Sequence, residues 1–301
     1  MTRHSFGFAL AVSAVLTIAA CAPVQTTPSP APARGERKPA APVRSETGAA
    51  QPKPAPAAAP AEASPTQSSP ADEIDATAAK VYEKIVLDAR ASGELNRDPA
   101  VLERARGIVA RLAAAMSAMS PDAPVRNWEV NVITAKDRNA WCMPGGKIAL
   151  YTGGLDRLQL SDDELAALLA HEMAHTLRGH GRDRALRYRE KAIANGATPA
   201  EANARFVEQA VDVLVLPPYP HPLETEADRV AIELAARAGY DPRAAIGLWE
   251  KMLRVANESP APAWLATHPA YPNRIRDLRA LAQKALPLYQ QQRKRGAAGA
   301  R

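Results

Sequence analysis

The stretch Leu168-Leu169-Ala170-His171-Glu172-Met173-Ala174-His175 decides how the rest of the chain is interpreted. It has the pattern H-E-x-x-H and follows a short apolar run. Two histidines four residues apart on a helix project from one face, about 6 Å apart along the axis, so both imidazoles can reach one Zn²⁺. Glu172 points roughly 100° away around the helix, toward a water at the metal's open position. The stretch therefore predicts the site of a zinc-dependent peptidase.

The residues around this motif predict a rigid helix from 161 to about 179. Ser161 and Glu164 have the spacing of a capping box, which fixes the start of a helix. The residues expected to face the core are Leu165, Leu168, Leu169 and Met173. The alternative is two surface histidines on an amphipathic helix, which the apolar run before the motif disfavours.

The composition allows one sizeable core and argues against a nucleic-acid partner. The chain has 301 residues, of which 47% are hydrophobic, and this suffices for a core of up to about 250 residues. The net charge is +6, and no concentrated basic face is visible in the part expected to fold. The two cysteines, Cys21 and Cys142, do not predict a disulfide, and Cys142 is expected to be a small buried residue.

The N-terminal sequence predicts a signal peptide and a lipid anchor. Residues 1–20 have a basic start and an apolar run that is too short for a comfortable membrane span. They end in Ile18-Ala19-Ala20-Cys21, which resembles a bacterial lipobox, so we expect a signal peptide over 1–20 and lipidation of Cys21. An ordinary secretory signal cut near Ala20 is the alternative. Ala22 favours the outer membrane of the bacterial envelope, on the periplasmic side.

Three further segments follow from composition and periodicity. Residues 21–70 are rich in Pro and Ala and cannot bury enough surface to fold, so they predict a disordered tether. Residues 71–288 are expected to form the folded domain, and 289–301 a basic flexible tail. The pattern within the domain predicts an α+β fold that is mostly helical.

The first part of the domain is expected to place a small sheet directly before the motif helix. Helical periods cover 71–93 and 99–118, with Asp98 as the cap of the second helix. The segments 128–133 and 147–152 alternate like strands, while 139–146 is rich in turn residues, so two or three strands are predicted. An edge strand at this place can pair with an extended substrate backbone, and a purely structural sheet is the alternative.

The second part is expected to be helical with Pro-rich interruptions. The predicted segments are a broken helix over 182–214, a rigid loop over 216–222, helices over 224–238 and from the cap Asp241 to about 255, a loop over 257–267 and a last helix over 275–285.

A third metal ligand is expected downstream of the motif. Glu224 and Asp228 stand four residues apart and share a helix face, so one carboxylate can bind Zn²⁺ while the other accepts a hydrogen bond from a ligand histidine. The alternative is an acidic first turn that complements the helix dipole. Spacing alone does not choose between Glu224 and Glu226. His180 and His221 are expected to be solvent-exposed or capping residues outside the metal site.

Four ordered motifs together resemble those of the M48 metallopeptidases. They are N-A-x-x-x-P-G-G-K-I at 139–148, H-E-x-x-H at 171–175, E-x-E-A-D at 224–228 and H-P-x-x-x-x-R-I at 268–275. The likeness covers about residues 72–285. It implies a zincin-like peptidase domain and one Zn²⁺ per chain, held by His171, His175 and Glu224, with Glu172 as general base and acid.

The resemblance also assigns roles to three more residues. Asp228 is expected to bond a ligand histidine, His268 to close the fourth metal position in a latent state, and Arg274 to stabilise the transition state. The alternatives for the last two are a loop histidine and an arginine at a helix N-terminus.

The function that follows is endoproteolysis of envelope proteins, in particular misfolded ones, by a lipid-anchored enzyme whose start resembles the small outer-membrane members of the family. The alternative is a largely latent, zinc-stabilised chaperone or assembly factor for outer-membrane proteins. A third hypothesis, a membrane-tethered binding module, predicts no metal at all.

Overall fold

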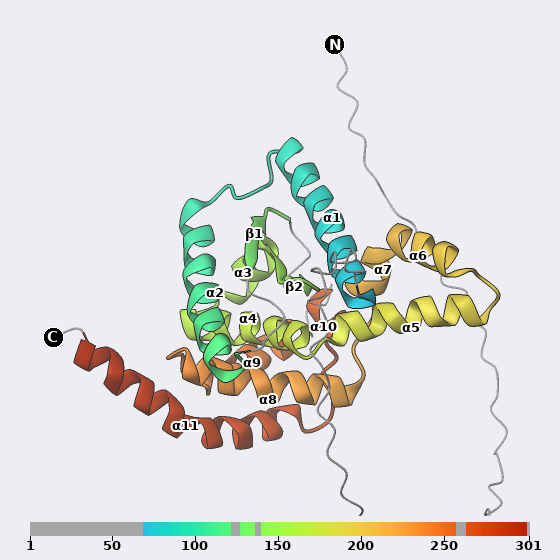
Figure 1. The fold of residues 1–301 in the computed structure, drawn as a ribbon. Coiled ribbons are helices and arrows are strands. Elements are labelled where there is room, and N and C mark those ends of the chain that lie inside the picture. Colours follow the sequence, from blue (N-terminus) through green and yellow to red (C-terminus); the bar gives the residue numbers. More distant parts are fainter. Residues whose placement is uncertain (1–68, 122–126, 136–139, 257–262, 300–301) are drawn as a thin grey trace, which may run out of the picture. The chain divides into compact units, whose positions relative to one another are not determined.

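The computed structural model describes residues 69–121, 127–135, 140–256 and 263–299, and these form a mostly helical fold with one small sheet (Figure 1). In chain order the elements are α1 (Pro70–Ala91), α2 (Pro99–Met119), β1 (Glu129–Ile133), β2 (Ala140–Met143), β3 (Lys147–Tyr151), α3 (Thr152–Leu158), α4 (Asp162–Leu177), α5 (His180–Ala194), α6 (Pro199–Glu208), α7 (Ala210–Leu214), α8 (His221–Arg237), α9 (Ala244–Ala256), α10 (Ala263–Thr267) and α11 (Arg274–Gly299). The predicted α+β class is confirmed.

Local capping explains where the first two helices begin. Ser69 and Asp72 form a capping box at the start of α1. Asp98 accepts hydrogen bonds from the backbone N–H groups of Ala100 and Val101, and Pro99 occupies the first turn of α2. Both helices agree with the predicted ranges.

The sheet has three strands in the order β1-β3-β2. β1 runs parallel to β3, and β2 runs antiparallel to it, so β2 lies at one edge. The predicted number of two or three strands is correct, but β2 was not located, because Asn139, Pro144 and the two glycines made 139–146 look rich in turns. The turn between β2 and β3 is limited to Pro144, Gly145 and Gly146, and both glycines have positive φ.

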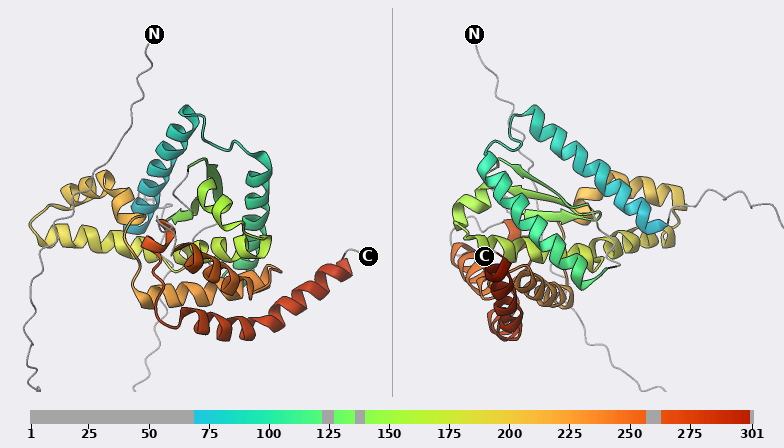
Figure 2. Two further views of the ribbon diagram at one scale, coloured as in Figure 1. Left: turned by 180° about the vertical axis from the view of Figure 1, so that it is seen from behind. Right: turned by 60° about the vertical axis from the view of Figure 1, so that its left-hand side comes forward.

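Helix α4 lies at the centre of the fold, in contact with β2 on one side and with α8, α9 and α2 on others (Figures 1 and 2). The predicted capping box is present: Glu164 N–H donates to Ser161 Oγ at 3.3 Å, and Ser161 N–H donates to Glu164 Oε2 at 2.8 Å. The residues predicted to face the core, Leu165, Leu168, Leu169 and Met173, are all fully or almost fully buried. The motif helix is therefore held on all sides.

Small residues allow α4 and α8 to approach closely. Ala167 of α4 and Ala231 of α8 line the same small cavity, next to His171 and Asp228 and together with residues of α9 and α11. Short side chains at such a crossing bring the helix axes nearer, and this brings the acidic face of α8 to the histidine face of α4. Helix α11 then packs on the far side of α8 (Figure 2).

Three predicted boundaries were wrong. α8 begins at His221 rather than at Glu224, because Pro222 fits the first turn of a helix. The short helix α10 occupies part of the loop predicted over 257–267. α11 continues to Gly299, although a helix to 285 and a flexible tail over 289–301 were expected. The helix contains Pro287, and Leu288 and Tyr289 beyond it still pack against the core.

The predicted signal peptide over 1–20, Cys21 and almost all of the predicted tether lie outside the described residues. Within the part of the chain that the structure describes, no helix has the length and apolar character needed to cross a membrane.

Candidate metal centre

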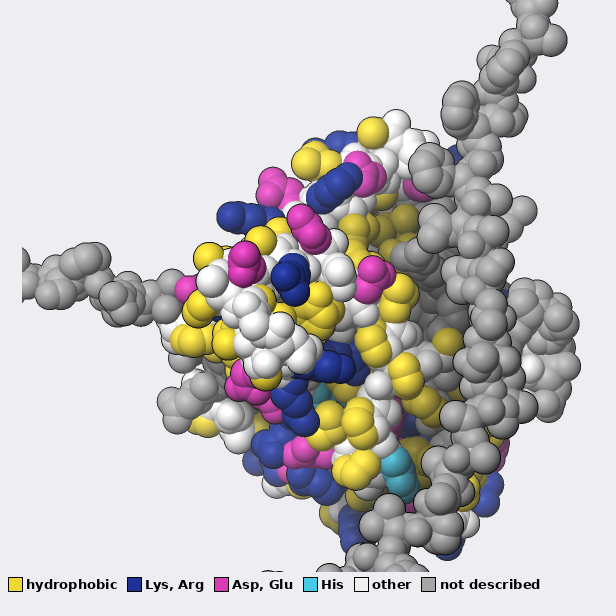
Figure 3. All heavy atoms as spheres, turned by 90° about the vertical axis from the view of Figure 1, so that its right-hand side faces the viewer, with side chains coloured by type: hydrophobic (Ala, Val, Ile, Leu, Met, Phe, Trp, Pro, Cys, Tyr) yellow, Lys and Arg dark blue, Asp and Glu magenta, His cyan; other side chains and the backbone are white. Residues whose placement is uncertain are grey.

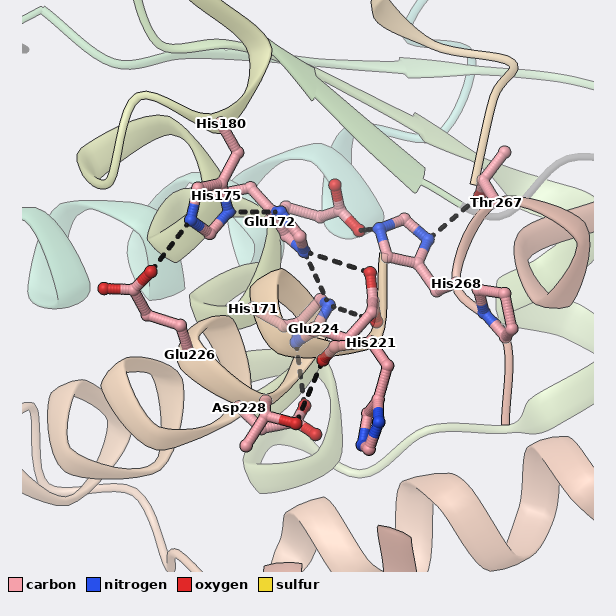
Figure 4. Close-up of polar contacts among 12 residues, drawn as sticks. His171, Glu172, His175, His180, His221, Glu224, Glu226, Asp228, Thr267 and His268 are labelled. Carbon is pink, nitrogen blue, oxygen red and sulfur yellow. Dashed lines mark hydrogen bonds and ion pairs between the residues drawn. The ribbon is translucent and has the colours of Figure 1, made fainter. Parts of the chain in front are cut away.

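Three side chains from two helices converge at the centre of the molecule (Figure 4). The Nε2 atoms of His171 and His175, both on α4, lie 3.1 Å apart. Glu224 on α8 faces them, with Oε2 at 3.5 Å from His171 Nε2 and Oε1 at 3.4 Å from His175 Nε2. All three residues are at most 3% exposed. The structure thus brings Glu224 to the histidines. The spacing alone did not choose between Glu224 and Glu226, and the resemblance to the M48 family implied Glu224.

A buried ion-pair cluster lies behind His171. Its Nδ1 is 3.0 Å from Asp228 Oδ1. Arg274 donates from Nη2 to Asp228 at 2.7 Å and from Nη1 to Glu224 at 2.8 Å, so one guanidinium holds both carboxylates. Its Cζ lies 3.6 Å from the centre of the Trp249 ring, and the Tyr271 hydroxyl donates to Asp228 Oδ2 at 3.0 Å.

His175 has a different neighbour behind it. Its Nδ1 is 2.9 Å from His180 Nδ1, and His180 Nε2 is 3.2 Å from Glu226 Oε2. One of two facing Nδ1 atoms must carry the proton. If His175 Nε2 presents its lone pair to the cluster, His175 Nδ1–H donates to His180, and His180 Nε2–H donates to Glu226. Glu226 also pairs with Arg178.

His180 was expected to be exposed or to cap a helix, and this was wrong, because its side chain is buried and bonds a motif histidine. It is not among the four residues whose donor atoms cluster. The only sequence signal is Gly179, whose left-handed φ of 73° turns the chain so that α5 starts beside the end of α4. His221, in contrast, is exposed, contacts the Tyr271 ring at a tilted angle and lies apart from the ligand atoms (Figure 4).

Glu172 and His268 complete the cluster. His268 follows α10 and is buried, with its Nε2 3.5 Å from Glu172 Oε1 and its Nδ1 2.9 Å from Thr267 Oγ1. One donor atom from each of His171, His175, Glu224 and His268 lies within 4.8 Å of the others. All the predicted site residues except Cys21, which is not described, therefore meet at one place.

The two motif histidines differ in their proton affinity. Burial opposes a proton on His171, but the contacts with Asp228 and Glu224 outweigh it and raise the pKa of His171 to about 9. Burial lowers the pKa of His175 to about 3, against the contact with Glu224. Burial would also raise the pKa of Glu224, but its contacts with both histidines hold that pKa well below the usual range.

These residues fit a bound Zn²⁺. Both Nδ1 atoms face other groups, so the two Nε2 atoms are directed at each other and at Glu224 Oε1, a buried oxygen that has no hydrogen-bond partner among the described residues. Zn²⁺ would take the place of the proton that His171 holds in the metal-free protein. The separations of 3.1, 3.4 and 3.5 Å are close to the roughly 3.3 Å between ligand atoms of a tetrahedral ion with bonds of about 2.0–2.1 Å.

Cys142 lies near the site but outside the ligand set. Its Sγ accepts a hydrogen bond from Thr176 Oγ1 at 3.1 Å. Burial raises the pKa of the Cys142 thiol far above its ordinary value, so the reactive thiolate is disfavoured. Cys142 was expected to be buried, and the structure shows it half-buried and packed against the core.

A helix that carries H-E-x-x-H, a facing glutamate on a second helix and an adjoining small sheet together define a zincin-like metallopeptidase domain. The model for Peptidase family M48 matches residues 103–282, more than half of the chain. The chain therefore belongs to peptidase family M48, and the resemblance seen in its motifs is confirmed.

Curated relatives match over part of their length. The mitochondrial metalloendopeptidase OMA1 of Schizosaccharomyces pombe is 32% identical over 50% of this chain and 45% of its own. The OMA1 metalloendopeptidase of Danio rerio is 32% identical over 54% of this chain and 37% of its own. The beta-barrel assembly-enhancing protease of Escherichia coli is 27% identical over 67% of this chain and 43% of its own. The chain thus spans less than half the length of these three relatives.

Proposed function

We propose that this protein is a zinc-dependent endopeptidase. The observation that carries the proposal is the convergence of His171, His175 and Glu224 within 3.1–3.5 Å, with Glu172 on the same helix as both histidines. Two imidazoles and a carboxylate are the ligand set of several catalytic zinc sites. The endopeptidase activity named for the similar OMA1 proteins supports the same reaction.

The residues of this chain have different roles in the proposed hydrolysis. Bound Zn²⁺ supplies Lewis acidity, which activates a water and polarises the scissile carbonyl. Glu172 takes the proton from the attacking water and later passes it to the leaving amine. Asp228 and His180 fix the tautomers of the two histidine ligands. β2, at the sheet edge in contact with α4, can pair with an extended substrate backbone.

Arg274 has a different place from the one its predicted role requires. Transition-state stabilisation needs a guanidinium beside the reacting carbonyl. In Arg274, however, Nη1 donates to Glu224 and Nη2 donates to Asp228. Its contacts support a positioning role, in which it holds the carboxylate ligand and the carboxylate behind His171.

We also propose that the enzyme acts on unfolded polypeptides in the bacterial envelope, held by a lipid on Cys21 at the outer membrane facing the periplasm. The lipobox-like sequence before Cys21 and the similarity to a beta-barrel assembly-enhancing protease support this proposal. A Cys21→Ser variant should move from the membrane fraction to the soluble fraction of the cell. Unchanged membrane fractionation would contradict the lipid anchor.

A largely latent form is the alternative function. His268 is buried against the other donors and lies 3.5 Å from the proposed general base, so it occupies the side from which a substrate must approach. A protein that stays in this closed arrangement would act as a zinc-stabilised chaperone or assembly factor rather than as an efficient protease.

One experiment separates these functions. Zinc content and casein cleavage are measured for the wild type, Glu172→Gln and His268→Ala. We expect one zinc per chain in all three, cleavage in the wild type, loss of cleavage in Glu172→Gln and faster cleavage in His268→Ala. Full cleavage by Glu172→Gln would refute the mechanism. Zinc without cleavage in both the wild type and His268→Ala would favour the chaperone, and no zinc would favour a binding module.

A further inference from the structure

A second cavity lies beside the metal centre, between α5, α7 and the loop that leads into α8. Its volume is about 530 Å³. Three cationic side chains of α5, Arg184, Arg187 and Lys191, line it, and among the described residues Asp212 is the one acidic side chain in its lining. Seen from this side, Lys and Arg side chains gather next to hydrophobic ones (Figure 3). The cavity thus combines apolar walls with an excess of positive charge.

Arg184 is the best-placed of these cations. Its Cζ lies 3.8 Å from the centre of the Tyr219 ring, which holds the guanidinium in one plane. Nη1 makes a long hydrogen bond of 3.4 Å to the carbonyl of Val213, and Nη2 is buried with no hydrogen-bond partner among the described residues. A buried N–H group without an acceptor is costly, and an incoming anion would relieve that cost.

The cavity shares a wall with the metal centre. The Tyr219 ring stacks on His175, with centroids 4.0 Å apart and planes at 23°. The backbone N–H of Tyr219 donates to the carbonyl of Thr267 at 3.2 Å, next to His268. His180, which bonds His175, also lines the cavity. A polypeptide lying across the metal centre can therefore reach this cavity with a neighbouring side chain.

We propose that this cavity binds the carboxylate side chain of an Asp or Glu in a polypeptide substrate, and so gives the enzyme a preference for acidic residues near the scissile bond. The proposal rests on the peptidase function proposed above. A planar guanidinium suits a carboxylate, which can accept two parallel hydrogen bonds from it. Val213 and the prolines of the loop can pack against the aliphatic part of a glutamate.

The test measures binding, so that it does not depend on cleavage. The full chain carrying Glu172→Gln and loaded with zinc is titrated into three fluorescein-labelled, C-terminally amidated peptides. The peptides are identical except for Glu, Gln or Lys at two positions, and binding is followed by anisotropy. We expect the Glu peptide to bind about tenfold more tightly than the Gln peptide, the effect of one hydrogen bond to a charged group. Added salt should reduce this preference.

Two further variants in the same background assign the preference to the cavity. Arg184→Gln should abolish it, while Arg205→Gln, which removes the same charge from an exposed position on α6, should leave it unchanged. If circular dichroism shows that Arg184→Gln does not fold, a double variant with Arg187→Gln and Lys191→Gln, both at exposed positions, replaces it. This double variant should lower the preference for the Glu peptide about threefold.

Equal binding of the three peptides would overturn the proposal, as would an Arg184→Gln variant that keeps the preference. Binding of phosphatidylglycerol vesicles that depends on Arg184, without any preference among the peptides, would overturn it in favour of a lipid headgroup. A Glu preference that depends on Arg184, in a protein whose wild type cleaves no casein, would support this site and refute the proposed peptidase function.

Discussion

The two motif histidines are held from behind in different ways. His171 faces the ionised Asp228, which is buried and bonded by Arg274 and Tyr271. His175 faces another imidazole, His180, which in turn bonds a partly exposed glutamate at the surface. One side of the metal centre is a closed cluster of buried charges. The other is a pair of neutral imidazoles that ends at a partly exposed glutamate, which is paired with Arg178.

This difference predicts which side of the metal centre contributes more to the free energy of unfolding. Removing one member of a buried ion pair leaves an uncompensated charge in a medium that solvates it poorly, at a cost of about 3–5 kcal/mol. Removing a member of a chain that reaches water costs far less, because water replaces the lost partner. The side behind His171 should therefore be the sensitive one.

The largest expected effect follows from Arg274→Met. The change leaves the carboxylates of Glu224 and Asp228 buried without their shared cation. We expect a loss of about 3–5 kcal/mol in the free energy of unfolding of the metal-free protein, measured with urea in the presence of a chelator. The loss should be smaller with zinc bound, because the metal replaces part of the missing charge.

Arg276→Met is the matched control for this change. Arg276 lies on the same helix, and its ion pair within the described part of the chain is with the neighbouring Asp277. Its side chain is 72% exposed. Its removal should change stability by at most about 1 kcal/mol. An Arg274→Met variant with unchanged stability and zinc affinity but slow cleavage would contradict the positioning role and restore the predicted role in the transition state.

The pH dependence of the metal-free protein tests the opposite proton affinities of the two histidines. The folded pKa of His171, about 9, is above the ordinary value of 6.5, so its proton stabilises the fold fully below pH 6.5 and that stability is lost as pH rises through 9. The folded pKa of His175 is depressed to about 3, so its contribution is lost as pH falls below 6.5. Stability should therefore be greatest near pH 6.5.

Between pH 6.5 and 9 we expect a fall of roughly 3 kcal/mol in the free energy of unfolding, as an order of magnitude. Urea titrations at intervals of pH, with a chelator present, measure it. A His171→Gln variant should not show this fall. A wild-type curve that is flat over this range would mean that His171 holds no extra proton.

The parts of the fold that could be predicted from the sequence are those fixed by local chemistry. Ser161 and Glu164 set the start of α4 through a capping box that needs no distant partner. A spacing of four residues put Glu224 and Asp228 on one helix face, so one carboxylate could be matched to the metal and the other to a motif histidine. The resemblance to the M48 family then implied that Asp228 is the second. Where local signals and burial agree, as in α2 and α4, the predicted ranges hold.

The remaining features depend on contacts between distant segments. His180 faces His175 only because the turn at Gly179 redirects α5, and no periodicity encodes that direction. β2 forms because Ala140–Met143 pairs with β3, although turn residues flank it. α11 continues beyond Pro287, where Leu288 and Tyr289 pack against the core. Local helix propensity does not reveal this packing.

The smallest expected effect lies on the His175 side and completes the comparison. His180→Ala removes the acceptor for His175 Nδ1–H, and groups that orient a ligand histidine are typically worth about 10–100-fold in metal affinity. We expect the low end, about tenfold, because the cavity beside Tyr219 lets water take the place of the imidazole.

Glu226→Gln should weaken zinc binding by no more than about threefold, since Glu226 is partly exposed and acts only through His180. Competition with a zinc-sensitive dye measures both. If His180→Ala destabilises the protein and weakens zinc binding as strongly as Arg274→Met does, the two sides of the metal centre are equivalent and the contrast between them fails.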